Sequence, residues 1–145
     1  MKKGFLIFLI LALISCMPKK KETEKNNSTE PEKITGTTEI IFNEDIHDFG
    51  VLTSGEIVVS TFVFTNTGTH KLIINKVESD CGCVKADFHK EPVKPGETGT
   101  IEVEFDSSGM FGKQYKSIEI HANFKEPKHL AIFAAVKNEI LEIKY

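Results

Sequence analysis

Two cysteines separated by one glycine, Cys81-Gly82-Cys83, are the feature of this sequence that points most clearly to chemistry. Gly82 supplies the backbone freedom that so small a ring needs, and the segment must bend there, because residues two apart in a flat strand are hard to bridge. Outside the cytosol such a pair tends to be oxidised. Three interpretations stay open: a local disulfide that fixes a turn and ends a strand, a soft-metal site for Cu(I) or zinc, and a redox-active dithiol.

A metal site at this pair would need further ligands. No histidine lies within five residues of it; His89 is the nearest and His70 the next, and we expect both to be exposed loop residues. A single Cys-x-Cys is also a weaker signal than the paired CxxC motifs of zinc sites. The sequence therefore assigns no metal ligands and predicts no cofactor.

His47 and Asp48 place an imidazole beside a carboxylate, as in a general base and its orienting partner. Adjacent residues of a strand point to opposite faces, so the two cannot pair without a bend. We read the segment instead as an edge strand in which Phe49 enters the core. The serine-glycine turns lack the G-x-S-x-G context of a nucleophile elbow. We therefore predict no catalytic residue and no enzyme activity.

The third cysteine, Cys16, follows a stretch that is typical of a secretory leader. Lys2 and Lys3 precede the apolar residues 5–14, which are too few to cross a bilayer but fit the core of a signal peptide. The sequence Leu-Ile-Ser-Cys at 13–16 resembles the lipobox of bacterial lipoproteins. This resemblance implies cleavage before Cys16 and acylation of its thiol, for example with palmitate, and of the new amino terminus. Residues 1–15 are thus expected to be a lipoprotein signal peptide, and lipid would anchor the mature protein to a membrane.

The residues after Cys16 have the composition of a tether. Positions 17–37 contain five Lys and four Glu, with Met17 and Ile34 as the only larger apolar residues. Such a segment cannot bury enough surface to offset the entropy of ordering. We therefore expect residues 16–37 to be the lipidated cysteine and a flexible, disordered linker, and residues 38–145 to be the folded domain.

The overall composition also excludes classes of protein. With 145 residues, 27% charged and 40% hydrophobic, the chain suits one globular domain plus a tail. The folded part holds eleven Lys and seventeen acidic residues, a net charge of −6, and the whole chain contains no Arg. Arg supplies the planar fork that reads phosphates and guanine edges, so nucleic-acid binding is not expected.

The folded part alternates apolar and polar residues with a period of two. Ile101, Val103 and Phe105 alternate with glutamates, which is typical of a half-buried strand. Further strands are expected at 58–64, 72–74, 84–88, 118–121, 130–136 and 140–143, with 58–64 central and covered on both faces. A helix is the alternative at 130–136. Eight or nine short strands separated by turn residues predict an all-β, immunoglobulin-like antiparallel β-sandwich of seven to nine strands.

Met110 and Phe111 lie between two glycines at what the sequence suggests is a hairpin tip. Two interpretations stay open for them. The tip could fold back onto the sheet, or the two apolar side chains could form a small contact patch for a partner.

Several of these motifs together resemble a family of bacterial secreted domains described as domain of unknown function 1573. The pattern includes His47-Asp-Phe-Gly50, Phe62-Val-Phe64, Cys81-Gly-Cys83 and Pro95-Gly96, and it covers roughly residues 40–123. Two positions depart from the usual pattern: Val84 stands where a Thr is common and Lys71 where a Pro is common. The resemblance implies an immunoglobulin-like sandwich related to those of major sperm protein, Hydin and pilus chaperones. It also implies a Bacteroidetes-type envelope location, often behind a lipoprotein signal, and it carries no established activity.

The sequence therefore predicts a monomeric, lipid-anchored interaction or structural module without catalytic activity. Its expected location is the bacterial cell envelope, on the inner or outer membrane, facing the periplasm or the cell surface. Its partners would be the membrane, through the lipid on Cys16, and another envelope protein or component, which could add a strand to a sheet edge. The alternative is a metal-handling or thiol-redox accessory protein that uses Cys81 and Cys83.

Overall fold

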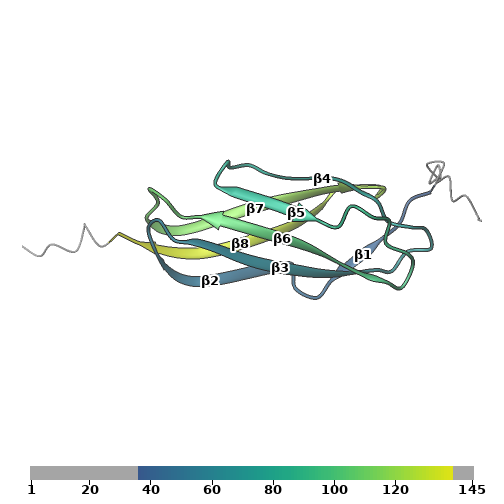
Figure 1. Ribbon diagram of the computed structural model, residues 1–145, viewed down its shortest axis with the longest axis horizontal. Coiled ribbons are helices and arrows are strands. Elements are labelled where there is room, and N and C mark those ends of the chain that lie inside the picture. Colours follow the sequence, from purple (N-terminus) through teal and green to yellow (C-terminus); the bar gives the residue numbers. More distant parts are fainter. Residues whose placement is uncertain (1–35, 139–145) are drawn as a thin grey trace, which may run out of the picture. The chain divides into compact units, whose positions relative to one another are not determined.

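The computed structural model describes residues 36–138. The predicted signal peptide, Cys16, nearly all of the linker and the strand expected at 140–143 lie outside this part. The described residues form eight strands in two sheets (Figure 1). The strands are β1 (Ile40–Phe42), β2 (Ile46–Thr53), β3 (Ile57–Asn66), β4 (Ile74–Ser79), β5 (Val84–Phe88), β6 (Thr98–Asp106), β7 (Gly112–Ala122) and β8 (Lys128–Lys137). No helix in this part of the chain has the length and hydropathy needed to cross a bilayer.

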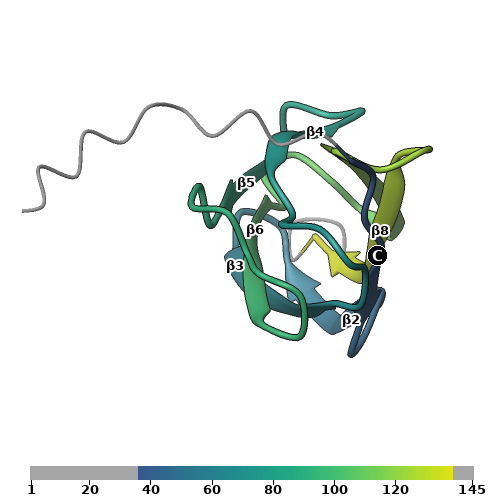
Figure 2. The ribbon, with the colours of Figure 1, turned by 90° about the vertical axis from the view of Figure 1, so that its right-hand side faces the viewer.

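The two sheets have four strands each, in the orders β1-β3-β6-β5 and β2-β8-β7-β4. Figure 2 looks along the strands, with β3, β5 and β6 on one side of the interior and β2 and β8 on the other. The predicted all-β, immunoglobulin-like sandwich is confirmed. One pair differs from the antiparallel expectation, because β2 and β8 run parallel, with Ile46 opposite Ala131. Residue alternation is the same in both directions and could not have revealed this.

The core lies between the inner faces of the sheets, and the alternation is clearest in β6, where every second residue from Gly99 to Phe105 is buried. Its largest fully buried apolar side chains are Phe64, Phe105, Leu72, Ile101, Ile118, Ile120, Leu130 and Ile132. In β8 the residues Leu130, Ile132, Ala134 and Val136 are all buried at every second position, so the segment is a strand and the helical alternative is wrong. The alternation expected at Ile101, Val103 and Phe105 is confirmed, since all three are buried in β6.

Two details of the sequence-based prediction need correction. The segment 58–64 lies in β3, and its outer face is not covered: Val59 is 50% exposed, because no further layer packs on this sheet. Met110 and Phe111 are not at a hairpin tip, because β6 and β7 belong to different sheets and the segment between them crosses the end of the sandwich. Their side chains also separate: Met110 packs against the core, whereas Phe111 is 70% exposed.

Candidate functional site

The candidate site is the part of the β3 edge that β1 does not cover. β1 pairs only with Phe64–Asn66, and the backbone N–H of Asn43 then donates to the carbonyl of Val63 at 3.0 Å. In an antiparallel strand, every second residue directs its backbone N–H and carbonyl to the same edge. The backbone groups of Ile57, Val59 and Thr61 therefore point to the same edge as those of Val63. β6 pairs with β3 on its other side, and within residues 36–138 no strand pairs with this edge of β3 at these three positions. Their backbone N–H and carbonyl groups are therefore open to a partner strand. We call residues 57–61 the free edge.

The side chains on the outer face of the free edge are apolar or neutral. Ile57 is 59% exposed and Val59 is 50% exposed, and Thr61 is exposed beside them. Isolated exposed apolar residues are common on proteins, but a strand edge that combines them with unpaired backbone groups is a template for strand pairing. The free edge therefore has the chemistry of a recognition site.

The edge strands β2, β4 and β5 in the described part carry features that discourage pairing. β2 is bulged between Asp48 and Val51, where Gly50 adopts a φ of 72°. β4 has an irregularity after Ile74 and carries Lys76, while β5 is only five residues long. Bulges, lysines and short length are the devices by which natural sheets protect their edges. The free edge of β3 contains no charge, no proline and no bulge.

The inner side of the free edge is bordered by aromatic rings. His47 packs against Phe49 with ring centroids 4.7 Å apart, and Phe49 stacks on Phe105 at 6.4 Å. β2 is an edge strand and Phe49 packs on the core, as the sequence predicted. The Nδ1 atom of His47 lies 3.2 Å from the carboxylate of Glu44, whereas Asp48 accepts a hydrogen bond from the backbone N–H of Gly50 at 2.8 Å. His47 and Asp48 therefore serve different partners.

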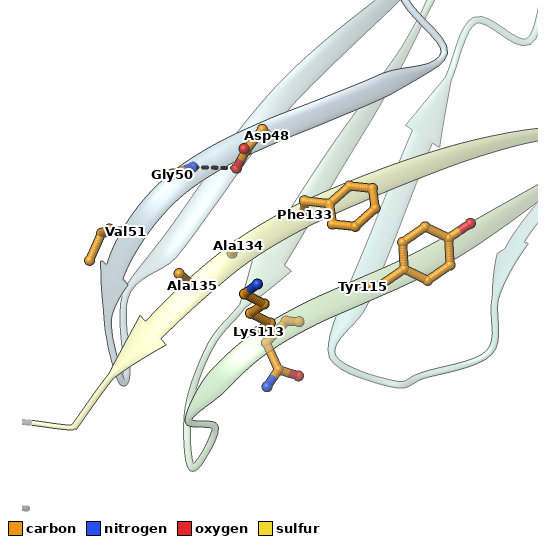
Figure 3. A pocket seen from close by; sticks show the side chains of 9 residues that line it. Asp48, Gly50, Val51, Lys113, Tyr115, Phe133, Ala134 and Ala135 are labelled. Atoms are coloured by element: carbon orange, nitrogen blue, oxygen red, sulfur yellow. Dashed lines mark hydrogen bonds between the residues drawn. The ribbon is translucent and has the colours of Figure 1, made fainter.

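A shallow pocket of about 480 Å³ lies on the outer face of the other sheet (Figure 3). Tyr115 and Phe133 are cross-strand neighbours on β7 and β8 with ring centroids 4.8 Å apart, and Lys113 and Val51 border the same hollow. The bulge at Gly50 forms part of its wall. The sequence-based prediction did not include Tyr115 and Phe133. The alternation of each strand could have revealed them, because Tyr115 and Phe133 do not belong to the alternate positions that are buried and therefore lie on the outer face.

Cys81 and Cys83 are joined by a disulfide in the segment that crosses from β4 to β5, with their Cα atoms 5.1 Å apart. The carbonyl of Cys81 accepts from the N–H of Val84 at 3.2 Å, and the carbonyl of Cys83 accepts from the N–H of Asp106 at 2.9 Å. Both cysteines are half-buried, and Cys83 packs against the core. These contacts fit a local bridge that starts β5. His70 and His89 are exposed, and among the described residues no three His, Cys, Asp or Glu side chains are placed to hold a metal ion.

The fully buried polar side chains bind the backbone of the domain itself. Asn66 accepts hydrogen bonds from Thr38 Oγ1 at 2.7 Å and from the N–H of Gly68 at 3.1 Å. Its amide donates to the carbonyls of His70 and Val93 at 2.8 and 2.9 Å. The hydroxyl of Ser107, also buried, lies 2.8 Å from the carbonyl of Glu56 and 3.1 Å from that of Thr53, and it accepts from the N–H of Gly55. These groups fix loops and are not available as nucleophiles.

Comparison with known families matches residues 40–136 to the family described as "Protein of unknown function (DUF1573)". The chain belongs to this family. The match spans all eight strands apart from the last residue of β8, so the resemblance seen in the motifs is confirmed over the whole sandwich. No curated protein matches the sequence.

Among solved structures, the chain resembles a protein of unknown function from Porphyromonas gingivalis W83, with a TM-score of 0.62 and 18% identity, over 70% of this chain and 48% of that one. The chain thus spans about half the length of that protein. The PapD-like domain 7 of human CEP192 gives a TM-score of 0.53 at 11% identity, covering 73% and 92%. The VesB protease of Vibrio cholerae gives 0.55 at 14% identity, covering 69% and 32%. At these identities the comparisons establish a shared β-sandwich fold and nothing more.

Proposed function

We propose that this DUF1573 protein is a lipid-anchored, non-catalytic interaction module of the bacterial cell envelope, and that it binds another envelope component by strand addition at the free edge. The observation that supports this is the unpaired stretch of β3, which combines outward backbone groups with exposed Ile57 and Val59. In strand addition, backbone hydrogen bonds supply affinity and alternate side chains supply specificity.

The arrangement of the polar side chains supports a non-catalytic role. Asn66 and Ser107 are satisfied by hydrogen bonds within the domain, and His47 and Asp48 have separate partners. The alternative, a metal-handling or thiol-redox accessory protein, depends on Cys81 and Cys83 alone. No third metal ligand accompanies them in the part of the chain that the structure describes.

The envelope location in this proposal is carried by the sequence at 13–16, which resembles a lipobox. Cys16 itself lies outside the described residues. The lipid would hold the domain close to a membrane, so that a partner on the same surface meets the free edge at a high local concentration.

Replacing Cys16 with alanine should move the protein from the membrane fraction to the soluble fraction of cells. The reason is that the acylated thiol supplies the membrane affinity, at about 0.8 kcal/mol per buried methylene. Fractionation with immunoblotting measures the change, and Cys81→Ala serves as the matched control that keeps the anchor. Undiminished membrane association of Cys16→Ala would contradict the lipid assignment.

A photo-crosslinking residue at Val59 should capture a reproducible partner in cells, because this side chain lies on the free edge. The matched control places the same photo-crosslinking residue at Asn75, which is also exposed and lies on an edge strand that carries an irregularity. Mass spectrometry identifies the adducts. Equal capture at both positions, or repeated recovery of the protein alone, would count against the proposal.

The same site can be blocked without disturbing the sheet. Proline has no backbone N–H, and the N–H of residue 59 faces the free edge. Val59→Pro therefore retains the hydrogen bonds between β3 and β6. Crosslinks formed from Thr61 should then disappear, while the circular-dichroism spectrum stays that of a β-protein. By contrast, Val58→Pro removes an N–H that faces β6 and should unfold the strand. A partner that still crosslinks in folded Val59→Pro binds elsewhere.

A further inference from the structure

We infer that the strand accepted by the free edge is a cationic one, an extended segment in which apolar residues alternate with lysine or arginine. This inference rests on the proposed strand addition and names the chemistry of the partner. It follows from what lies on the two faces of β3 next to the free edge.

Acidic residues line the outer face of β6, the strand that pairs with β3 on the side opposite the free edge. Ile57 is opposite Asp106, Val59 is opposite Glu104, and Thr61 is opposite Glu102. On the next strand, β5, Asp87 is opposite Glu102 and Lys85 is opposite Glu104. The outer face beside the free edge thus carries four carboxylates and one ammonium group, which gives it a net negative charge.

Two of these carboxylates, those of Glu102 and Asp106, are not in close contact with Lys85 and can approach a cation from a partner. The ammonium of Lys85 pairs with Glu104 at 2.8 Å, and this contact raises the pKa of Lys85. Asp106 accepts from the N–H of Ser108 at 2.9 Å, and hydrogen bonding from Ser108 lowers the pKa of its carboxyl, so it stays charged at neutral pH. Among the described residues, the close ion pair of Lys85 is with Glu104, and Lys85 acts on Asp106 only through a longer-range attraction that also lowers the pKa of Asp106.

The geometry of an added strand brings cations to these carboxylates. Partner residues directly opposite Ile57, Val59 and Thr61 would share their outer face, about 5 Å from them and about 10 Å from β6. Lysine and arginine have apolar stems that lie along apolar surface while the charged head extends beyond it. Their stems would cover exposed Ile57 and Val59, and their heads would reach Glu102 and Asp106.

The intervening partner residues would point to the inner face. There they would meet half-buried Val58 and Phe49 at the open side of the sandwich. Removal of these apolar side chains from water would stabilise the complex. The two faces together specify alternation of cationic and apolar residues, a period of two that matches a strand.

The test uses the purified full chain in detergent and three end-capped nine-residue peptides that alternate Val-Lys, Val-Thr and Val-Glu. Fluorescence anisotropy should show the Val-Lys peptide binding at least about tenfold more tightly than the Val-Glu peptide, with Val-Thr between them. The preference should shrink as the salt concentration rises from about 0.05 to about 0.5 M, because exposed charges are screened.

Protein variants separate the charge inference from strand addition. Glu102→Gln with Asp106→Asn should reduce binding of the Val-Lys peptide to that of the Val-Thr peptide, whereas Asp80→Asn, an exposed acid outside this face, should leave the preference intact. Folded Val59→Pro should bind none of the three peptides. If the wild type binds the three peptides equally and Val59→Pro binds none of them, the cationic inference is overturned, whereas strand addition is supported.

Two further results would overturn the inference. One is Val-Lys binding that persists in folded Val59→Pro, which would mark general attraction to an acidic protein. The other is the absence of binding by any peptide. Neither result decides the proposed function, which is tested separately by the capture of a partner at Val59 in cells.

Discussion

Replacing Asn66 with leucine is expected to lower the free energy of unfolding by about 4 kcal/mol or more. The change removes four hydrogen bonds, each with a net value of about 1 kcal/mol, and leaves their partners without a substitute. Asn66 is fully buried, so water cannot replace them. Since the total free energy of unfolding of a small domain is about 5–15 kcal/mol, this loss would remove a large part of the stability.

Urea unfolding followed by circular dichroism measures the effect as a fall in the midpoint at constant slope. The matched control is Asn75→Leu, because Asn75 is exposed, and it should change the stability by no more than about 0.5 kcal/mol. A loss below about 1 kcal/mol for Asn66→Leu would show that the buried hydrogen bonds do not hold this end of the sandwich together.

Replacing Phe64 with alanine is expected to cost about 3–5 kcal/mol, the range for removing a large buried aromatic side chain. Phe64 is fully buried and its ring lies edge-on to Phe42 with centroids 6.0 Å apart. The same ring lies over Gly99, its cross-strand neighbour, so closely that a Cβ at position 99 would clash with it. Gly99→Ala should therefore cost about 1–3 kcal/mol through overpacking.

The two changes should be strongly non-additive. Once Phe64→Ala has removed the ring, the added methyl group at position 99 has space, so Gly99→Ala should cost little more in the double variant. A double-mutant cycle from urea or thermal unfolding measures this coupling. If the two losses of stability simply add, the close approach of the ring does not explain the glycine, and its effect is a property of the backbone alone.

Both sites lie at the end of β3 beyond the free edge. Asn66 connects this end of the strand to the segment before β1, through Thr38, and to the loop before β6, through Val93. The ladder to β6 holds β3 along its whole length from the other side. The free edge is therefore part of a rigid element, and a strand that adds to it does not have to order it, which reduces the entropic cost of binding.

The sequence by itself determined the fold class, because a period of two in apolar residues commits each segment to a strand with one buried face. It did so even at 130–136, where the alanines suggested a helix, since Leu130 and Ile132 continue the inward set of β8. The spacing of Cys81 and Cys83 left a disulfide, a metal site and a redox dithiol open, and only the structure joins the two cysteines in a disulfide. The segment 47–50 was correctly predicted to lie on an edge strand with Phe49 directed to the core.

Only the tertiary structure decided which edge of which strand is free. Ile57, Val59 and the buried residues of β3 are all apolar or neutral, so the sequence suggested a strand covered on both faces. Whether the edge of β3 is paired depends on β1, a separate segment of the chain. β1 is three residues long and leaves the sheet after Phe42. The residue pattern of β3 does not show where this neighbouring strand ends. Strand order and direction are set by pairing between segments far apart in the chain, and side-chain alternation carries no information about either.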